Sequence, residues 1–319
     1  MPGPGVLGVP GVAVACAGPG CVLGGRLAER LGVELLEVHS KRFPDGESYV
    51  RVEGEARGRL VAAVSTGYPE PSVRVVEHLL LVEALRGLGA AGVVSVLGYM
   101  PYSRQDRRFL RGEPISVRAV ARAVAAAGSD ALAVVDVHKP WCLDWFPGPS
   151  VNVEPWRLFA EKLREGLGSG PLYVVAPDRG ALPRARRLAE ELGAAFDFLE
   201  KSRDRVTGEV TLKPKTVEVE GATVVLVDDI TSTGGTLAKA ARLLYSLGAR
   251  RVLAAVTHCL LAEGAEEKLR EAGVEALYCS NTVEPRAGPL VRVVDVSPAV
   301  AEAVEALAAR LHGYEQEPR

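Results

Sequence analysis

The sequence predicts an α/β protein with two duplicated domains, each a parallel sheet flanked by helices. Short apolar strands alternate along the chain with helices rich in Ala, Leu and Arg. The pattern Leu-Ala-Glu-x-Leu-Gly begins at Leu27 and again at Leu188, and Leu-Gly-Ala followed by a strand begins at Leu88 and again at Leu247. Two repeats about half a chain length apart indicate duplication of one α/β unit.

The spacing of the repeats places the domain boundary near the middle of the 319 residues. We expect an N-terminal domain over residues 1–150 and a C-terminal domain over residues 151–319. The connection is expected near residues 147–157, where Pro and Gly interrupt the pattern. Two domains of this size can each bury a full hydrophobic core.

The composition argues against several classes of function and location. No apolar run approaches the length that spans a bilayer, so we expect no membrane partner. The net charge of −2 and pI near 6.3 give no support for nucleic-acid binding. The N-terminal stretch lacks the positive charge of a secretory signal, which predicts a cytoplasmic protein.

Cysteine and amide usage add two expectations about the cellular setting. The five cysteines show no paired metal spacing, and we expect them to be small buried hydrophobes in a reducing compartment. Asn and Gln each occur only twice, a depletion of thermolabile amides that suggests a heat-adapted source.

The most informative stretch is Val-Val-Leu-Val-Asp-Asp-Ile-Thr-Ser-Thr-Gly-Gly-Thr, residues 224–236. Val224 to Val227 read as a buried parallel strand that ends in two carboxylates, Asp228 and Asp229. A loop of hydroxyl residues and glycines then opens a helix: Ser232, Thr233, Gly234, Gly235 and Thr236. Free backbone N–H groups at a helix N-terminus bind phosphate, and the helix dipole supports this.

Two acids beside a phosphate loop repel a second phosphate but suit the hydroxyls of a sugar. The loop has no Lys and is therefore not the ATP-gripping P-loop. We expect a sugar phosphate here, with the sugar held by the acids and its phosphate by the loop. The alternative is a plain strand–turn–helix with an acidic cap, as any α/β protein offers.

Two stretches of the N-terminal domain are candidates for a nucleotide. Residues 42–47, Arg-Phe-Pro-Asp-Gly-Glu, form a turn before an alternating strand, and their aromatic face and acceptors could hold a purine. A loop with Arg104 and Gln105 follows the buried strand 93–97, and its arginines suit a polyphosphate. A hairpin turn and a salt-bridged surface are the respective alternatives.

Three further motifs follow predicted strands. His138 and Asp178 lie at strand ends and could together hold a magnesium ion through its waters, although a lone His is usually structural. Residues 198–210 carry Lys201 and Arg203, either in a mobile cationic loop that closes over a transferring phosphoryl group or in a charged surface hairpin. Because ligands bind beyond strand carboxyl ends, we expect one composite site.

In order, the motifs Arg-Phe-Pro-Asp-Gly-Glu, Tyr-Met-Pro-Tyr-Ser-Arg-Gln-Asp, Asp-Val-His, Pro-Asp-Arg-Gly, Glu-Lys-Ser-Arg and Val-Asp-Asp-Ile-Thr-Ser-Thr-Gly-Gly-Thr resemble those of ribose-phosphate diphosphokinases. The resemblance covers roughly residues 12–300 and is nearest to the archaeal-type branch. It implies two phosphoribosyltransferase-like domains. It also implies conversion of ATP and ribose 5-phosphate to AMP and 5-phospho-α-D-ribose 1-diphosphate, with Mg2+ as cofactor.

The resemblance also assigns roles to the residues. It implies adenine contacts from Phe43, Asp45, Gly46 and Glu47, in a neighbouring subunit's site, and ATP contacts from Arg104 and Gln105. His138 and Asp178 would serve magnesium. Lys201 and Arg203 would stabilise the transferring group, with Arg203 also near the sugar phosphate. Asp228 and Asp229 would bind ribose hydroxyls, and Ser232, Thr233, Gly234, Gly235 and Thr236 the 5-phosphate. The family is homo-oligomeric, with sites at subunit interfaces.

Two other functions stay open. A phosphoribosyltransferase would consume the diphosphate product, but the duplicated domain argues against it. So does Ser232, because transferases usually carry an acid there. Many relatives within the diphosphokinase family also carry Asp at this position, so one contact is changed. A non-catalytic regulatory homologue would lack the cationic and metal residues, which are present here.

Overall fold

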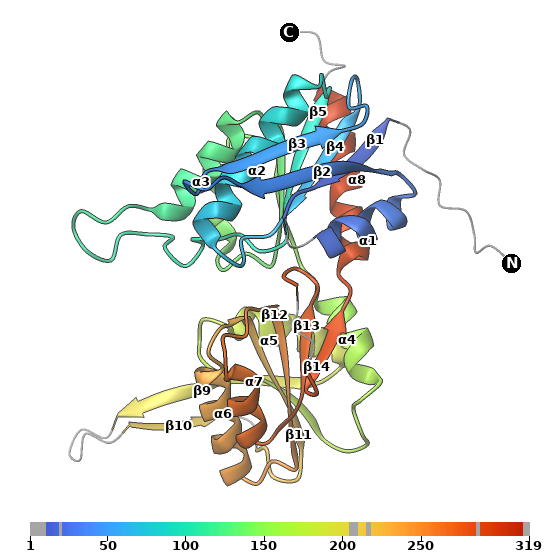
Figure 1. Cartoon of the computed structure of the whole chain (residues 1–319). Helices are drawn as coiled ribbons and strands as arrows, with labels where there is room; N and C mark the ends of the chain where they lie inside the picture. Colours follow the sequence, from blue (N-terminus) through green and yellow to red (C-terminus); the bar gives the residue numbers. More distant parts are fainter. Residues whose placement is uncertain (1–10, 19–20, 204–209, 215–217, 285–287, 315–319) are drawn as a thin grey trace, which may run out of the picture. The chain divides into compact units, whose positions relative to one another are not determined.

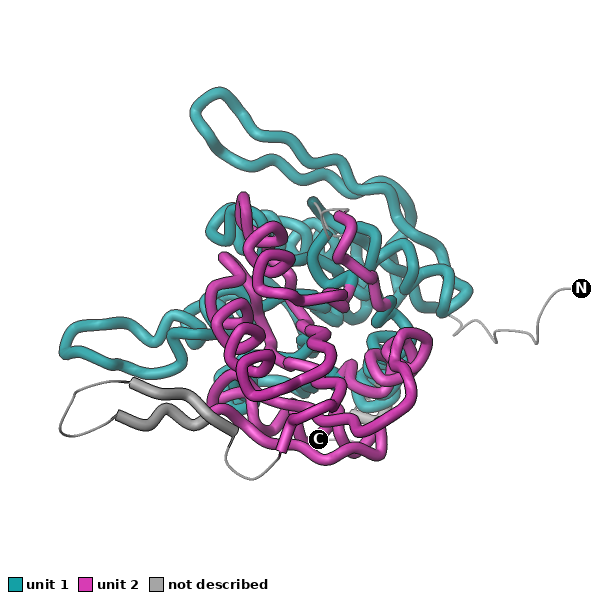
Figure 2. Tube along the Cα trace, turned by 90° about the horizontal axis from the view of Figure 1, so that it is seen from below, with its two compact units in different colours: residues 1–154, 281–284, 295–319 teal, residues 155–280, 285–294 magenta. Residues whose placement is uncertain are grey.

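A computed structural model of the chain describes residues 11–18, 21–203, 210–214, 218–284 and 288–314 (Figure 1). For residues 200–203, 210–214 and 312–314 only the backbone is described. The chain divides into two compact units (Figure 2). Unit 1 comprises residues 1–154, 281–284 and 295–319, and unit 2 comprises residues 155–280 and 285–294.

Unit 1 contains a seven-stranded sheet with the order β3-β2-β1-β4-β5-β6-β7, in which only β3 is antiparallel to its neighbour. Its elements are β1 (Val12–Cys16), α1 (Cys21–Leu31), β2 (Glu34–Arg42), β3 (Ser48–Glu53), β4 (Leu60–Ser65), α2 (Pro71–Gly87), β5 (Gly92–Leu97), α3 (Ser116–Ala126), β6 (Ala131–Val135), the 3-10 helix η1 (Pro140–Trp145), β7 (Ser150–Val153) and α8 (Ser297–Tyr314).

Unit 2 repeats this arrangement with the order β10-β9-β8-β11-β12-β13-β14, in which only β10 is antiparallel. Its elements are α4 (Trp156–Arg164), β8 (Leu172–Ala176), α5 (Leu182–Leu192), β9 (Ala195–Arg203), β10 (Val210–Pro214), β11 (Thr223–Thr231), α6 (Gly235–Ser246), β12 (Arg251–Cys259), α7 (Ala265–Glu271), β13 (Val274–Ser280) and β14 (Val291–Val294). The shared order confirms the predicted fold class.

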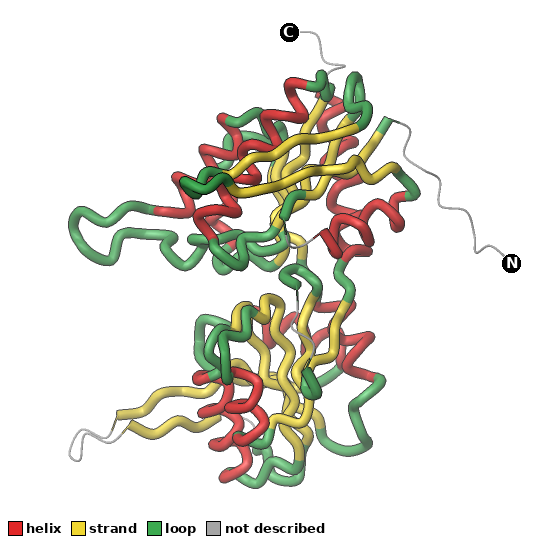
Figure 3. Tube along the Cα trace, viewed as in Figure 1, coloured by secondary structure: helices red, strands yellow, loops and turns green. Residues whose placement is uncertain are grey.

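Helices cover both faces of each sheet (Figure 3). In unit 1, α2 and α3 pack together on one face and α1 and α8 on the other; in unit 2, α4 pairs with α5 and α6 with α7. The central strands β1, β4, β5 and β6 are therefore buried along their whole length. This explains why they are continuous apolar runs and not alternating ones.

The units differ from the predicted boundaries at both ends of the second domain. The prediction assigned residues 151–319 to one domain, but β7 completes the sheet of unit 1. Helix α8, at the C-terminal end, packs on α1 and on strands β5, β6 and β7, so it also belongs to unit 1. Docking of a terminal helix on a distant sheet leaves no local sequence signal.

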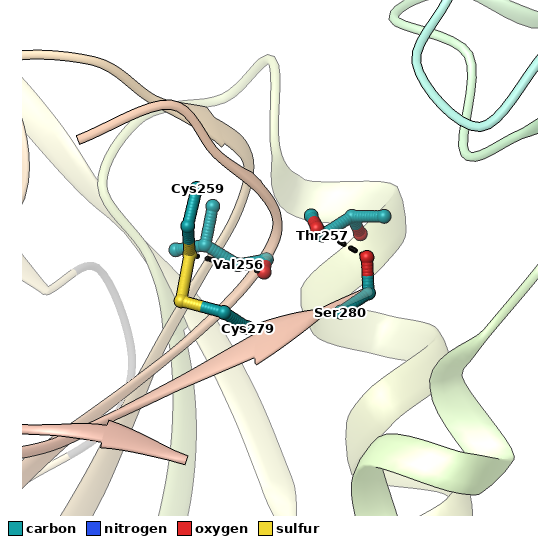
Figure 4. The surroundings of a disulfide bond; sticks show 5 residues. All are labelled: Val256, Thr257, Cys259, Cys279 and Ser280. Atoms are coloured by element: carbon teal, nitrogen blue, oxygen red, sulfur yellow. Dashed lines mark hydrogen bonds between the residues drawn. A yellow bond between two sulfur atoms is a disulfide. The ribbon is translucent and has the colours of Figure 1, made fainter. Parts of the chain in front are cut away.

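The cysteine expectation is wrong for three of the five residues. Cys259 at the end of β12 and Cys279 in β13 form a disulfide, with their Cα atoms 5.8 Å apart (Figure 4). The two residues are 20 positions apart in sequence, and only the pairing of adjacent strands brings them together. A disulfide suits an oxidising compartment or an intracellular protein of a hyperthermophile. Cys16 and Cys142 are buried thiols, as expected, whereas Cys21 is exposed.

Among the described residues, no helix combines the length and apolar character needed to cross a membrane.

The disulfide should stabilise unit 2 measurably. Closing a loop of this length lowers the entropy of the unfolded chain by an amount worth about 3 kcal/mol. We expect a reductant to lower the melting temperature of the wild type and to have no such effect on Cys259→Ser. Cys142→Ser is the matched control and should keep the reductant sensitivity. Equal reductant responses in the wild type and Cys259→Ser would contradict the assignment.

Candidate functional site

The predicted sugar-phosphate motif lies at the point where the strand order of unit 2 reverses. From β8 the chain moves outward to β9 and β10, and from β11 it moves outward in the other direction. In open α/β sheets ligands usually bind beyond the carboxyl ends of the strands at such a point, which here are the adjacent parallel strands β8 and β11. Asp178 follows β8, and residues 228–236 occupy the end of β11 and the turn after it.

Strand β11 is longer than the predicted run Val224 to Val227. Ile230 and Thr231 still pair with β12, at His258 and Cys259. Both acidic residues therefore lie within the strand and not after it. A paired strand holds its backbone more firmly than a free loop, so the acidic side chains project from a fixed base.

The turn after β11 is fixed by hydrogen bonds that its carbonyl groups accept. The carbonyl oxygens of Thr231, Ser232 and Thr233 each accept a hydrogen bond from the segment between β12 and α7 or from α7 itself. The donors are the Leu260 N–H (2.9 Å), the Ala262 N–H (2.9 Å) and Lys268 Nζ (3.1 Å), respectively. In a trans peptide the N–H points opposite to the carbonyl. The N–H groups that follow these carbonyls are therefore directed away from that segment.

Gly234 completes the turn and cannot be replaced without strain. It caps α6 with φ of 69°, a left-handed conformation that favours glycine. A Cβ atom at this position would lie 3.0 Å from the carbonyl oxygen of Ala265 and 3.2 Å from Cγ of Leu269. The first N–H groups of an α-helix have no partner within the helix, and with the helix dipole they make the start of α6 suited to an anion.

The carboxylate pair has an unequal electrostatic environment. Asp229 is buried, and its Oδ2 lies 3.5 Å from Nη2 of Arg184, which is itself buried on α5. Burial, and then the charge of Asp229, raises the pKa of Asp228 to about 8, while Arg184 opposes the rise. The pair therefore takes up a proton near neutral pH, which lowers its negative charge, and its remaining oxygen lone pairs can still accept hydrogen bonds from sugar hydroxyls.

Arg184 is a site residue that the sequence reasoning missed. The basic helix after the Pro-Asp-Arg-Gly motif is visible in the sequence, but nothing local distinguishes Arg184 from the arginines beside it. The structure separates them by burial, because Arg186 and Arg187 are exposed and pair with Glu190 on their own helix. An arginine at a buried helix position is the signal that a helical-wheel reading could have found.

Asp178 is exposed at the start of the loop that leads to α5. Its Oδ1 accepts hydrogen bonds from the N–H groups of Gly180 (2.6 Å) and Ala181 (3.3 Å). This turn fixes the direction of the carboxylate through one oxygen. Carboxylate oxygen is the ligand that magnesium prefers, so Asp178 fits the metal role that the sequence predicts.

The loop of unit 1 that corresponds to the phosphate loop has different chemistry. It follows β4 and leads into α2 as Thr66-Gly67-Tyr68-Pro69-Glu70, with a cis peptide before Pro69. Glu70 caps α2, and its carboxylate contacts Arg42 (3.1 Å) and Arg74 (3.7 Å). The Glu70 side chain makes no capping hydrogen bond to α2, but its negative charge at the start of the helix disfavours a phosphate there. Of the two corresponding loops, that of unit 2 is the one suited to phosphate.

The loops after β5 and β6 in unit 1 are tied together. Trp141 in η1 donates a hydrogen bond from Nε1 to Oδ2 of buried Asp106 (2.9 Å). Gln105 precedes Asp106 and accepts a hydrogen bond from the Ser116 hydroxyl at the start of α3. His138, half-buried, lies in the loop between β6 and η1. Arg104 is exposed, so its guanidinium is accessible to a ligand.

The Phe43–Glu47 turn forms the tip of the β2–β3 hairpin. Gly46 has φ of 96°, and the Phe43 N–H donates to the Glu47 carbonyl (2.8 Å). All of these side chains are exposed, and the Phe43 ring packs edge-on against Tyr49 with 5.9 Å between ring centroids. Figure 2 shows the hairpin and the loop after β5 as separate projections of unit 1. The ring is partly exposed, and Lys41 Nζ lies over it, 4.9 Å from its centroid.

The cationic segment is a hairpin, not a loop that follows a strand. Lys201 and Arg203 belong to β9, where they pair with Leu212 and Val210 of β10. The segment forms a strand because it pairs with β10, whereas its charged sequence alone does not predict a strand. The side chains of these two residues lie outside the described part of the structure, as do residues 204–209.

Together these features define an α/β protein of the phosphoribosyltransferase type: a glycine-capped anion loop beside an acidic pair at the switch point. Protein-family comparison agrees. Residues 21–128 match the N-terminal domain of ribose phosphate pyrophosphokinase, and residues 156–283 match the phosphoribosyl transferase domain.

Individual relatives carry the same name. The Methanopyrus kandleri ribose-phosphate pyrophosphokinase is 44% identical over 295 residues, covering 92% of this chain and 99% of the relative. The Thermococcus kodakarensis protein is 48% identical over 252 residues, covering 79% and 88%. The crystal structure of Mycobacterium smegmatis phosphoribosylpyrophosphate synthetase matches with a TM-score of 0.84 and 29% identity, over 94% of this chain and 99% of that one. The chain belongs to the ribose-phosphate pyrophosphokinase family.

Gly234 offers a test of the anion loop with a matched control. Gly234→Ala forces a side chain into the left-handed region and should cost about 1–2 kcal/mol of stability. Because the loop then shifts, the dissociation constant for ribose 5-phosphate should rise about tenfold or more. Isothermal titration calorimetry measures this change. Gly193, at the end of α5, has a similar φ of 68° and no atom within 4 Å of an added Cβ, so Gly193→Ala carries the same backbone strain outside the loop and should bind normally. Equal affinities for the two variants would contradict the role of the turn.

The pKa of Asp228 predicts a pH dependence of stability. Below the ordinary value of 3.8 the carboxyl is protonated in both the folded and the unfolded state. Between that value and about 8 the unfolded chain ionises while the folded one keeps its proton, so the free energy of unfolding falls as pH rises. Urea unfolding of Asp228→Asn should show a smaller fall between about pH 5 and 8 than the wild type. The same slope in both proteins would refute the raised pKa.

Proposed function

We propose that this protein is a ribose-phosphate pyrophosphokinase that transfers the β,γ-diphosphoryl group of ATP to the 1-hydroxyl of D-ribose 5-phosphate. The 1-oxygen bonds to the β-phosphorus, and the bond from that phosphorus to the bridging oxygen of the α-phosphate breaks. AMP leaves with that oxygen, and the hydroxyl proton is released. The observation that carries the proposal is the anion loop beside the acidic pair, in a chain of this family.

In this proposal, unit 2 binds the acceptor. The 5-phosphate lies against Ser232, Thr233, Gly234, Gly235 and Thr236, where backbone N–H groups and hydroxyls supply donors. Asp228 and Asp229 accept hydrogen bonds from the ribose hydroxyls. Arg184 compensates the buried charge of Asp229, so that the acids can approach a phosphorylated sugar at a lower electrostatic cost.

Unit 1 is proposed to bind the nucleotide. Arg104 and Gln105 contact ATP, and the links of Asp106 to Trp141 and of Gln105 to Ser116 support the position of their loop. Phe43, Asp45, Gly46 and Glu47 contact adenine. Their exposure at a hairpin tip supports a role in the site of a neighbouring subunit. A homo-oligomer and a cytoplasmic location stay predictions of the sequence.

Magnesium is the proposed cofactor. When bound, it neutralises charge on the phosphate oxygens and orients them. Asp178 offers a carboxylate of fixed direction, and His138 can hydrogen-bond a magnesium-bound water. That these two residues serve a single ion stays a prediction. Lys201 and Arg203 are proposed to stabilise the transferring diphosphoryl group, since positioned positive charge is what this reaction requires.

Phosphorus NMR of the purified protein with ATP, ribose 5-phosphate and magnesium tests the proposal. We expect AMP to appear together with a sugar-linked diphosphate. Formation of ADP would instead indicate single phosphoryl transfer and a wrongly assigned donor. Nucleotide binding without turnover would indicate a regulatory homologue.

The same assay can separate chemistry from binding. Lys201→Ala should lower kcat strongly, by about 100-fold or more, with little change in the KM for ATP, because its charge acts mainly in the transition state. Lys162→Ala is a control in the same unit, since Lys162 pairs with Glu165 on the surface of α4. A kcat of Lys201→Ala equal to that of the control would remove Lys201 from the mechanism.

A further inference from the structure

A cluster of metal-binding side chains lies on the β2–β3 hairpin, outside the proposed site. The antiparallel register places Glu37 opposite Glu53 and His39 opposite Arg51. Side chains alternate between the two faces of a strand, so these four residues share one face. Val38, Val50 and Val52 share the other face and pack against the core of unit 1. The polar face is therefore the outer one.

Three ligand atoms converge on this face. His39 Nε2 lies 3.4 Å from Oε1 of Glu37 and 3.3 Å from Oε2 of Glu53. One oxygen of each carboxylate and one imidazole nitrogen all lie within 4.8 Å of one another. Nε2 is shielded from solvent, and it lies at ion-pair distance from both oxygens without meeting hydrogen-bond geometry to either one. The nitrogen thus faces the space between the carboxylates and not either oxygen alone.

Two of the three spacings match those between the ligands of a metal ion. Ligand atoms about 2.0–2.1 Å from a tetrahedral zinc ion are about 3.3–3.4 Å apart. The two nitrogen–oxygen distances already have this value. An ion at the centre would contact the imidazole and both carboxylates with only a small closing movement of the two glutamates.

The electrostatics of the hairpin favour a bound cation. Like charges directly opposite each other on paired strands are destabilising, and Glu37 and Glu53 occupy such positions. Arg51 pairs with Oε1 of Glu53, which leaves Oε2 directed at His39. A partner that holds the far side of a ligand fixes its orientation, as is common around metal sites.

We propose that Glu37, His39 and Glu53 bind a borderline divalent metal ion, with Zn2+ as the representative ion. Imidazole nitrogen with two carboxylates suits zinc and its neighbours in the transition series, whereas magnesium and calcium favour oxygen alone. The site is therefore distinct in chemistry from the proposed magnesium site. The ion joins β2 to β3 on the hairpin whose tip carries Phe43–Glu47, and so limits the freedom of that tip.

Zinc binding to the full-length protein, first treated with chelator, tests the proposal by equilibrium dialysis without nucleotide or sugar. We expect His39→Ala and Glu53→Gln each to bind one zinc ion fewer per chain than the wild type. The wild type should bind that ion with a dissociation constant of about 10 µM or lower. Glu34→Gln removes a carboxylate from the same strand outside the cluster and should bind as the wild type does. Each variant is compared with the wild type, so zinc bound elsewhere, for example by the exposed Cys21 thiol, does not change the difference in the number of bound ions.

The pH dependence gives a second readout. The zinc ion lost in the variants should bind at least about tenfold more weakly at pH 5.5 than at pH 7.5, because protonated imidazole is not a ligand. Retention of the full number of zinc ions in either His39→Ala or Glu53→Gln would overturn the proposal. A wild type that binds no zinc would overturn it as well.

Discussion

The site depends on how the turn after β11 is held. The carbonyl groups of Thr231, Ser232 and Thr233 accept hydrogen bonds from the segment between β12 and α7 and from Lys268 of α7. This leaves the N–H groups of the turn free to face a ligand. Gly234 then has to adopt the left-handed conformation, close against α7, for the chain to enter α6. An anion loop made in this way is preorganised, because its donors are fixed by the sheet and helices around it.

Around this turn, unit 2 combines charged side chains whose burial one at a time would be unfavourable. Two adjacent carboxylates at a strand end oppose each other, and one of them is relieved by buried Arg184. The topologically equivalent turn of unit 1 instead ends in Glu70, which is paired with arginines. The corresponding turns of the two duplicated units thus differ in their chemistry. One is suited to an anionic sugar, and the other already contains its own carboxylate.

The sequence predicted the parts that local chemistry determines. The apolar run before Asp228 and the glycine pair gave the strand, the turn and the phosphate loop, because each has its own residue pattern. The parts it missed all depend on partners distant in the chain. Pairing with β12 extends β11, packing inserts Arg184 beside Asp229, and adjacent strands join Cys259 to Cys279. Docking of α8 on unit 1 belongs to the same class.

A crystal structure of the protein with ribose 5-phosphate would show directly whether the turn after β11 binds the sugar phosphate. We expect the phosphate within hydrogen-bonding distance of the N–H groups of Thr233 to Thr236, with ribose hydroxyls against Asp228 and Asp229. A sugar phosphate bound at the loop after β4, with the turn after β11 empty, would contradict it.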